Sequence, residues 1–307
     1  MPILTVRHVT TYRYRQPVSF GEHRMMLRPR AGHDQRLLEA RIDITPKPSE
    51  FWWVHDVFGN SVGLARFTTR ARELRFESTM RLDHNPVEEL DFRLEEHARS
   101  LPFSYSTEEM PDLARSIERH EADPDRAVDH WARSFLSKDG PTGTLELLVA
   151  MTREVKRDFT YIARSIRGIQ EPWRTLELGS GTCRDFALLM MEAVRSLGLA
   201  ARFVSGYIYS PGRDGGMHMG GGSTHAWVRV YLPGAGWVEF DPTNGIVGNR
   251  DLIRVAVARD PAQAVPLHGR WKGFPDDSLG MEVSVNVTSE GSGKAPPVRS
   301  AAALPGA

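Results

Sequence analysis

Cysteine and net charge are the scarcest features of this 307-residue chain. It has one cysteine, Cys183, and its 39 lysines and arginines balance its 39 aspartates and glutamates. A single cysteine excludes an internal disulfide of the kind that stabilises many small secreted domains. A balanced charge produces no long-range positive field, so we expect neither nucleic acid nor an anionic membrane as a partner.

Long apolar runs are also absent from the sequence. A membrane-spanning helix needs about 20 apolar residues in succession, and arginines or glycines interrupt the longest candidate runs within a few positions. The first residues, MPILTVRHVTTYRYR, have neither the apolar core nor the small-residue cleavage site of a signal peptide. We therefore expect a soluble, cytoplasmic protein, and nothing in the composition indicates its oligomeric state.

The pattern along the chain predicts four parts. Residues 1–87 contain short β-type runs separated by turns, which predict an amino-terminal antiparallel β-sandwich domain. Residues 88–141 are acidic and helical and predict a helical bridge. Residues 142–290 carry helices followed by strands, the order of an α+β core. Residues 291–307 are small, polar and proline-bearing, which predicts a disordered tail.

The single cysteine lies at the start of a predicted helix, in the stretch GSGTCRDFALLMMEAV. Thr182 is placed to cap this helix, and Asp185 follows three residues later, as in a capping box. We assign Asp185 this structural role. A thiol at a helix N-terminus is near the positive end of the helix dipole, which favours the thiolate. The alternative is a buried cysteine that serves as a small hydrophobic residue.

Two later residues are candidate partners of the thiol. His225 opens the run HAWVRVYL and Asp241 closes the run WVEFD, so we expect them on neighbouring antiparallel strands. If the loop between these strands spans residues 232–236, Trp227 lies opposite Asp241 and His225 is the diagonal neighbour of Asp241 on the same face. A loop one residue shorter would put them on opposite faces. Taken singly, His225 fits a surface histidine and Asp241 a turn former.

The segments GTCRDFALLMMEAVRSLGLAARFVSGYIYS and THAWVRVYLPGAGWVEFDPTNG hold these three residues in the order Cys, His, Asp. Together they closely resemble the core of bacterial proteins of the transglutaminase-like superfamily. YRYRQPVSFGEHRMMLRPR and DVFGN resemble the amino-terminal domain that accompanies this core. The resemblance implies a papain-like α+β core in which Cys183 is the nucleophile, His225 the general base and then acid, and Asp241 the residue that orients the imidazole.

The chemistry that this resemblance implies is attack of a thiolate on an amide, through an acyl-thioester that water or an amine resolves. The backbone N–H of Cys183 is one donor for the oxyanion. Related folds take the second donor from an upstream glutamine or tryptophan, so Gln170 and Trp173 are candidates, with packing as the alternative. Trp227 shares the predicted face of His225 and either shields the site or serves as a core residue.

Two functions remain open at this point. The first is a cysteine protease, amidase or acyl transferase whose substrate is a protein or peptide. The second is a non-enzymatic module that binds a peptide in the same groove. The sequence has no phosphate-binding glycine motif, no zinc-ligand spacing and no calcium-binding loop near the core. We therefore expect no cofactor and no metal.

Overall fold

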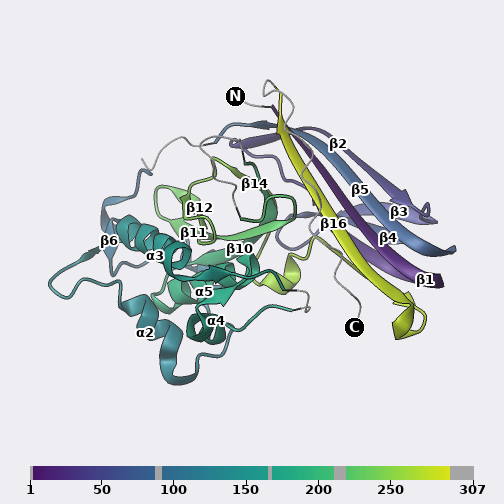
Figure 1. The fold of residues 1–307 in the computed structure, drawn as a ribbon. Helices are drawn as coiled ribbons and strands as arrows, with labels where there is room; N and C mark the ends of the chain where they lie inside the picture. The colour runs from purple at the N-terminus through teal and green to yellow at the C-terminus, as the bar shows by residue number, and fades with distance from the viewer. Residues whose placement is uncertain (1–2, 87–91, 165–167, 211–218, 291–307) are drawn as a thin grey trace.

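The computed structural model describes residues 3–86, 92–164, 168–210 and 219–290. A curled antiparallel sheet, built mainly from the first part of the chain, lies beside a smaller sheet that carries the helices (Figure 1). The α+β class and the antiparallel amino-terminal β domain are thus confirmed. The predicted tail, residues 291–307, lies outside the described residues.

The larger sheet has seven strands. They are β1 (Ile3–Arg28), β2 (Gln35–Thr45), β3 (Glu50–His55), β4 (Ser61–Arg66), β5 (Arg70–His84), β15 (Leu267–Lys272) and β16 (Ser278–Ser289). The first half of β1 pairs with β5 and β16, and its second half pairs with β4 and β15. The register with β5 shifts between Arg13 and Val18, and such irregularities bend a strand. The strands therefore form one continuous curled sheet around an apolar interior that includes Phe20, Leu74 and Phe76.

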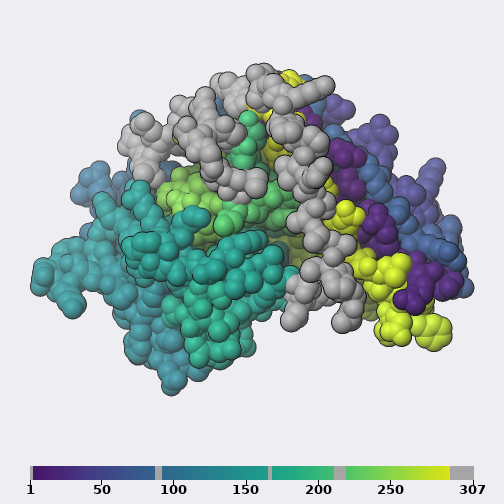
Figure 2. Space-filling model, viewed as in Figure 1, coloured from purple at the N-terminus to yellow at the C-terminus, as the bar shows by residue number. Residues whose placement is uncertain are grey.

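The last two strands correct the predicted domain ranges. Residues 267–289 fall within the range 142–290 assigned to the core, yet β15 and β16 pair with β1. Figure 2 shows these yellow residues lying along the purple residues of β1. An unpaired edge of β1 would expose a row of backbone N–H and C=O groups, which the returning strands satisfy. Pairing between the two ends of a chain leaves no local pattern by which the sequence reveals it.

The smaller sheet has five antiparallel strands in the order β13-β12-β11-β10-β14. Their bounds are β10 (Ala201–Ile208), β11 (His225–Leu232), β12 (Gly236–Asp241), β13 (Ile246–Val247) and β14 (Leu252–Ala258). Two further pairs of very short strands are β6 (Ser100–Leu101) with β7 (Thr142–Gly143), and β8 (Thr160–Tyr161) with β9 (Ser180–Gly181).

The helices gather on the side of the smaller sheet that is remote from the curled sheet (Figure 1). They are α1 (Met110–Ile117), α2 (Ala127–Arg133), α3 (Thr144–Asp158), α4 (Pro172–Leu178) and α5 (Cys183–Ser196). α5 is buried along most of its length and packs against β10 and β11. In the described part of the chain, no helix is both long and apolar enough to cross a membrane.

The predicted helical bridge contains α1 and α2, and it packs as part of the core. Val128 and Ala132 of α2 are fully buried in the same apolar cluster as α5. The Arg195 guanidinium of α5 donates to the carbonyl of Ser116 at 3.0 Å and pairs with Glu192 at 2.8 Å. A segment held by a buried hydrogen bond to α5 and by apolar contacts is not a free linker.

Two side-chain amides of the larger sheet region cover the open edge of β14. Gln35 donates to the carbonyl of Arg254 at 2.7 Å and accepts from its N–H at 3.1 Å. Asn60 bonds the backbone of Val257 in the same way, at 2.7 and 2.9 Å. An uncovered edge strand is open to pairing with other chains. These contacts, with an apolar interface that includes Leu4, Met80 and Ile253, join the two sheets.

Candidate functional site

Cys183 is the first residue of α5, and its position follows from a capping box. The Oγ1 of Thr182 accepts from the N–H of Asp185 at 3.4 Å, and Asp185 accepts from the N–H of Thr182 at 2.7 Å. The predicted cap is therefore confirmed. The Cys183 side chain is 7% exposed, at the end of the helix where backbone N–H groups have no helical acceptor. This placement puts the sulfur at the positive end of the helix dipole.

Asp185 also ties the preceding segment to the helix start. Its second oxygen, Oδ1, accepts from Arg164 at 2.6 Å and from the backbone N–H of Gln170 at 2.7 Å. The side chain is fully buried. With both oxygens occupied in this way, Asp185 is a structural residue, as the sequence indicates.

β11 and β12 pair in the register that places His225 beside Asp241. Tyr231 lies opposite Trp237 and Val228 opposite Phe240, so Trp227 falls opposite Asp241. His225 Nε2 lies 2.7 Å from Asp241 Oδ2, and both side chains are buried. The predicted register and the predicted proximity of the two residues are both confirmed.

The charges of the buried pair reinforce each other. Burial by itself would lower the pKa of His225, but the Asp241 carboxylate and the Cys183 sulfur raise that pKa to about 10. Burial would raise the pKa of Asp241, yet His225, Asn244 and the N–H of Thr243 hold it below its ordinary value. His225 Nδ1 has no hydrogen-bond partner among the described residues, and because Asp241 holds Nε2, Nδ1 is the ring nitrogen available to Cys183. The pair thus favours a protonated imidazole beside an ionised carboxylate.

Tyr161 is a neighbour of the thiol that the sequence analysis missed. It lies in β8 and pairs with Gly181 of β9, two residues before Cys183. Burial, together with the nearby Cys183 sulfur and the Asp185 carboxylate, raises the pKa of Tyr161 to about 12. Two strands of two residues each are too short for a periodic pattern, so no sequence signal points to this tyrosine.

Asn244 is a second residue that was missed. Its Nδ2 donates to Asp241 Oδ2 at 2.8 Å and to the carbonyl of Met219 at 3.2 Å, and its Oδ1 accepts from the N–H of Met219 at 2.8 Å. In the sequence it stands in DPTNG, where an asparagine beside glycine is typical of an ordinary turn. Only the folded structure shows that it contacts the candidate site.

The three other candidates have different surroundings. The Gln170 amide donates to Thr175 at 3.0 Å and to the carbonyl of Ser180 at 2.9 Å. The Trp173 indole N–H donates to Glu171 at 2.6 Å. The donors of both candidates are therefore engaged with other residues of the fold. Trp227 is fully buried, and its ring stacks on that of His225 with centroids 5.9 Å apart, as its shared face predicts.

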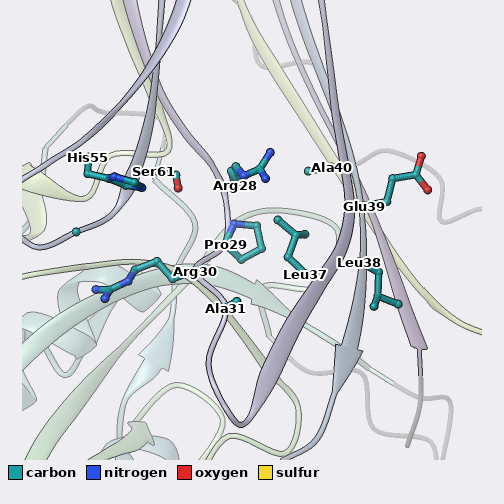
Figure 3. Close-up of a pocket in the computed structure, with 11 residues that line it drawn as sticks. Arg28, Pro29, Arg30, Ala31, Leu37, Leu38, Glu39, Ala40, His55 and Ser61 are labelled. Atoms are coloured by element: carbon teal, nitrogen blue, oxygen red, sulfur yellow. The ribbon is translucent and has the colours of Figure 1, made fainter.

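A hollow of about 680 Å³ lies on the larger sheet, away from these residues (Figure 3). Its lining includes Arg28, Arg30, Leu37 and His55 and contains none of the candidate site residues. Arg28 lies over the ring of Trp53, and Arg30 donates to the carbonyl of Phe58 at 2.7 Å. Both guanidinium groups therefore have partners within the fold, and we assign this hollow no chemistry.

Two known protein families match this chain, one in its amino-terminal part and one in the part that carries the candidate site. Residues 4–83 match the bacterial transglutaminase-like N-terminal region, and residues 129–242 match the transglutaminase-like superfamily. The second range contains Cys183, His225 and Asp241.

Several proteins align with this chain over nearly its whole length. The uncharacterized protein Rv2569c of Mycobacterium tuberculosis is 32% identical over 300 residues, which cover 92% of this chain and 91% of that protein. ML0607 of Mycobacterium leprae is 25% identical over 289 residues, 92% of this chain and 98% of that protein. A crystal structure from Cytophaga hutchinsonii, described as a candidate cysteine protease, has a TM-score of 0.70 at 19% identity, covering 96% and 93% of the two chains, and shows the shared fold. The chain belongs to the transglutaminase-like superfamily, with the amino-terminal region typical of its bacterial members.

Proposed function

We propose that this protein is a thiol enzyme that acts on amide bonds of proteins or peptides, with Cys183 as nucleophile, His225 as acid and base, and Asp241 as the residue that orients the imidazole. The observation that carries the proposal is the buried imidazole of His225, bonded through Nε2 to Asp241 and left with Nδ1 for a sulfur at a helix start. The description of the Cytophaga hutchinsonii structure as a candidate cysteine protease agrees with this chemistry.

The first step is acylation of the sulfur. The Cys183 thiolate attacks the amide carbonyl carbon, and the carbonyl π electrons move to oxygen. When the tetrahedral intermediate collapses, the carbon–nitrogen bond breaks and the proton on His225 Nδ1 goes to the leaving amine. A thioester remains on Cys183. Neutral His225 then takes a proton from water or from a second amine, which attacks the thioester and releases the thiolate.

Two groups are placed to donate to the oxyanion. The backbone N–H of Cys183 is at the free N-terminus of α5. The Tyr161 hydroxyl is beside the sulfur, so it is within reach of an oxygen on the carbon that the sulfur attacks. We assign Tyr161 the position that related folds fill with glutamine or tryptophan. Donors fixed before the reaction stabilise the developing charge without reorganisation.

Mass spectrometry of a peptide library, incubated with the protein with and without a primary amine, tests the proposal. Cleavage indicates a protease, a one-dalton gain indicates deamidation, and a gain equal to the amine less ammonia indicates acyl transfer. Cys183→Ala should abolish every change, and Tyr161→Phe should slow it by about 100-fold, as loss of an oxyanion donor does. Wild-type activity that persists in Cys183→Ala would exclude Cys183 as nucleophile. Peptides bound but never altered would favour the non-enzymatic module.

A further inference from the structure

The loop of residues 219–223 lies against the imidazole of His225. Gly220 has a positive φ of 90°, and a Cβ at this position would lie 2.7 Å from His225 Nδ1. The carbonyl of Gly222 accepts from the N–H of Val285 in β16 at 2.9 Å, so the larger sheet holds the far end of the loop. The near end is held by Asn244, through both backbone groups of Met219.

The orientation of the Asn244 amide is fixed by its partners. Oδ1 accepts from the Met219 N–H, while Nδ2 donates to the Met219 carbonyl and to Asp241 Oδ2. A rotated amide would turn its NH2 group toward an N–H and its oxygen toward a carboxylate oxygen. Both contacts would be repulsive, so the surroundings allow one arrangement.

The Asn244 amide is also one of the hydrogen-bond donors to the Asp241 carboxylate. Asp241 Oδ1 accepts from the N–H of Thr243 at 2.9 Å, and its Oδ2 accepts from both His225 and Asn244. A carboxylate with all its donors fixed cannot rotate, so the imidazole that it binds keeps one direction. A displacement of about 1 Å between reacting groups costs about 100-fold in rate, which is why this direction matters.

We infer that Asn244 is a positioning residue: its amide holds the loop of residues 219–223 across His225 and shares the Asp241 oxygen that binds the imidazole. This inference rests on the proposed function. Asn244 touches neither the sulfur nor the substrate carbonyl in the proposed mechanism and acts through His225 and Asp241. The ionisable groups around it are His225 on β11, Asp241 on β12 and, beyond the imidazole, Cys183 on α5 with Tyr161 on β8.

Two substitutions test the role through the rate at which iodoacetamide alkylates Cys183 between about pH 5 and 8. Asn244→Ala removes both contacts and should slow alkylation about tenfold or more at every pH. Asn244→Asp is isosteric: its protonated carboxyl donates its one O–H to Asp241, its other oxygen accepts from the Met219 N–H, and only the longer bond to the Met219 carbonyl is lost. Once ionised, it places a second negative charge next to Asp241 and near the thiolate. Its rate should therefore match the wild type at the acid end and fall progressively below it as pH rises.

Asn286→Ala, at an exposed asparagine of β16, is the matched control and should follow the wild type throughout. An Asn244→Asp profile parallel to the wild type would overturn the inference. So would an Asn244→Ala protein with a lowered melting temperature and unchanged alkylation, because a purely structural residue behaves in that way. If Asn244→Ala does not fold, the pH profile of the isosteric Asn244→Asp still tests the inference. Alkylation needs no substrate, so a failure to process any peptide would count against the proposed function and leave this result standing.

Discussion

Each side chain around Cys183 has its own role in the proposed mechanism. In the proposed mechanism the sulfur reacts as a thiolate at the start of α5, beside His225, whose raised pKa keeps the imidazole protonated at neutral pH. Asp241 balances the imidazolium charge from the opposite side of the ring. Burial strengthens each of these interactions, because little water is present to screen them.

Asp241→Asn separates the orienting role from a structural one. The two oxygens of Asp241 accept from Thr243, Asn244 and His225. Asparagine has one acceptor oxygen, so its NH2 group must face a donor, and the His225 tautomer is expected to invert. We expect turnover to fall roughly ten- to a thousand-fold, less than in a serine protease because the thiolate–imidazolium pair is already charged.

The measurement for Asp241→Asn is turnover together with melting temperature, with Cys183→Ala as the inactive control. A small change in melting temperature with a large loss of turnover supports the orienting role. An unchanged rate with a lowered melting temperature would show that Asp241 only shapes the turn before Pro242.

At the scale of single elements, the site depends on short and local structures. The capping box sets where α5 begins and therefore where the sulfur lies. The parallel pair β8 and β9 brings Tyr161 to this helix start, although each strand has only two residues. The turn between β11 and β12 sets the register of His225 against Asp241. An error of one residue in any of these elements would separate the reacting groups.

Thr182→Ala tests the contribution of the cap. Loss of the Thr182 hydroxyl removes its bonds with Asp185, at 3.4 Å to the N–H and 2.8 Å to Oδ2. We expect the free energy of unfolding to fall by about 1 kcal/mol. Alkylation of Cys183 should also slow, because a frayed first turn stabilises the thiolate less.

Chemical denaturation and the alkylation rate measure both effects of Thr182→Ala, and Thr68→Ala, at an exposed loop threonine, is the matched control. Equal stability of the two variants would show that Asp185 and its other partners hold the helix start without the hydroxyl.

At the scale of the whole molecule, the curled sheet supports the smaller sheet through buried polar contacts. Arg254 of β14 makes a two-point ion pair with Asp34, with both distances 3.0 Å, and also bonds Glu239 of β12 at 2.7 Å. Glu239 is two residues before Asp241 on the same strand. Asp34, next to β2 of the larger sheet, is therefore linked through Arg254 to the strand that carries the candidate catalytic aspartate, and β16 contacts the loop beside His225.

Arg254→Leu should destabilise the protein strongly. It leaves the buried carboxylates of Asp34 and Glu239 without their shared cation, and removal of one partner of a buried pair typically costs about 3–5 kcal/mol. Arg36→Leu breaks an exposed ion pair with Asp83 in the larger sheet and should change the free energy of unfolding little. Denaturant unfolding of both variants checks this difference. A similar, small loss in both would mean that water or rearranged side chains replace Arg254.

The sequence by itself determined the parts of the site that depend on residues near one another in the chain. The cap at Thr182 and Asp185 is read from a spacing of three residues. The sequence tied the placement of His225 beside Asp241 to a loop of residues 232–236, and the structure has the register that this loop gives. The segments that hold Cys183, His225 and Asp241 resemble the core of the superfamily, and the family matches confirm this resemblance. The helix dipole, side-chain alternation in strands and turn geometry act over a few residues, so they leave patterns that a sequence displays.

Only the tertiary structure decided the remainder. Tyr161 lies near Cys183 because two-residue strands pair. Asn244 contacts Met219 and Asp241, and β16 pairs with the opposite end of the chain. The tertiary structure also showed that the donors of Gln170 and Trp173 are engaged elsewhere. Contacts of this kind arise from the packing of distant segments, whose relative positions depend on the free energy of the whole fold and leave no periodic trace in the sequence.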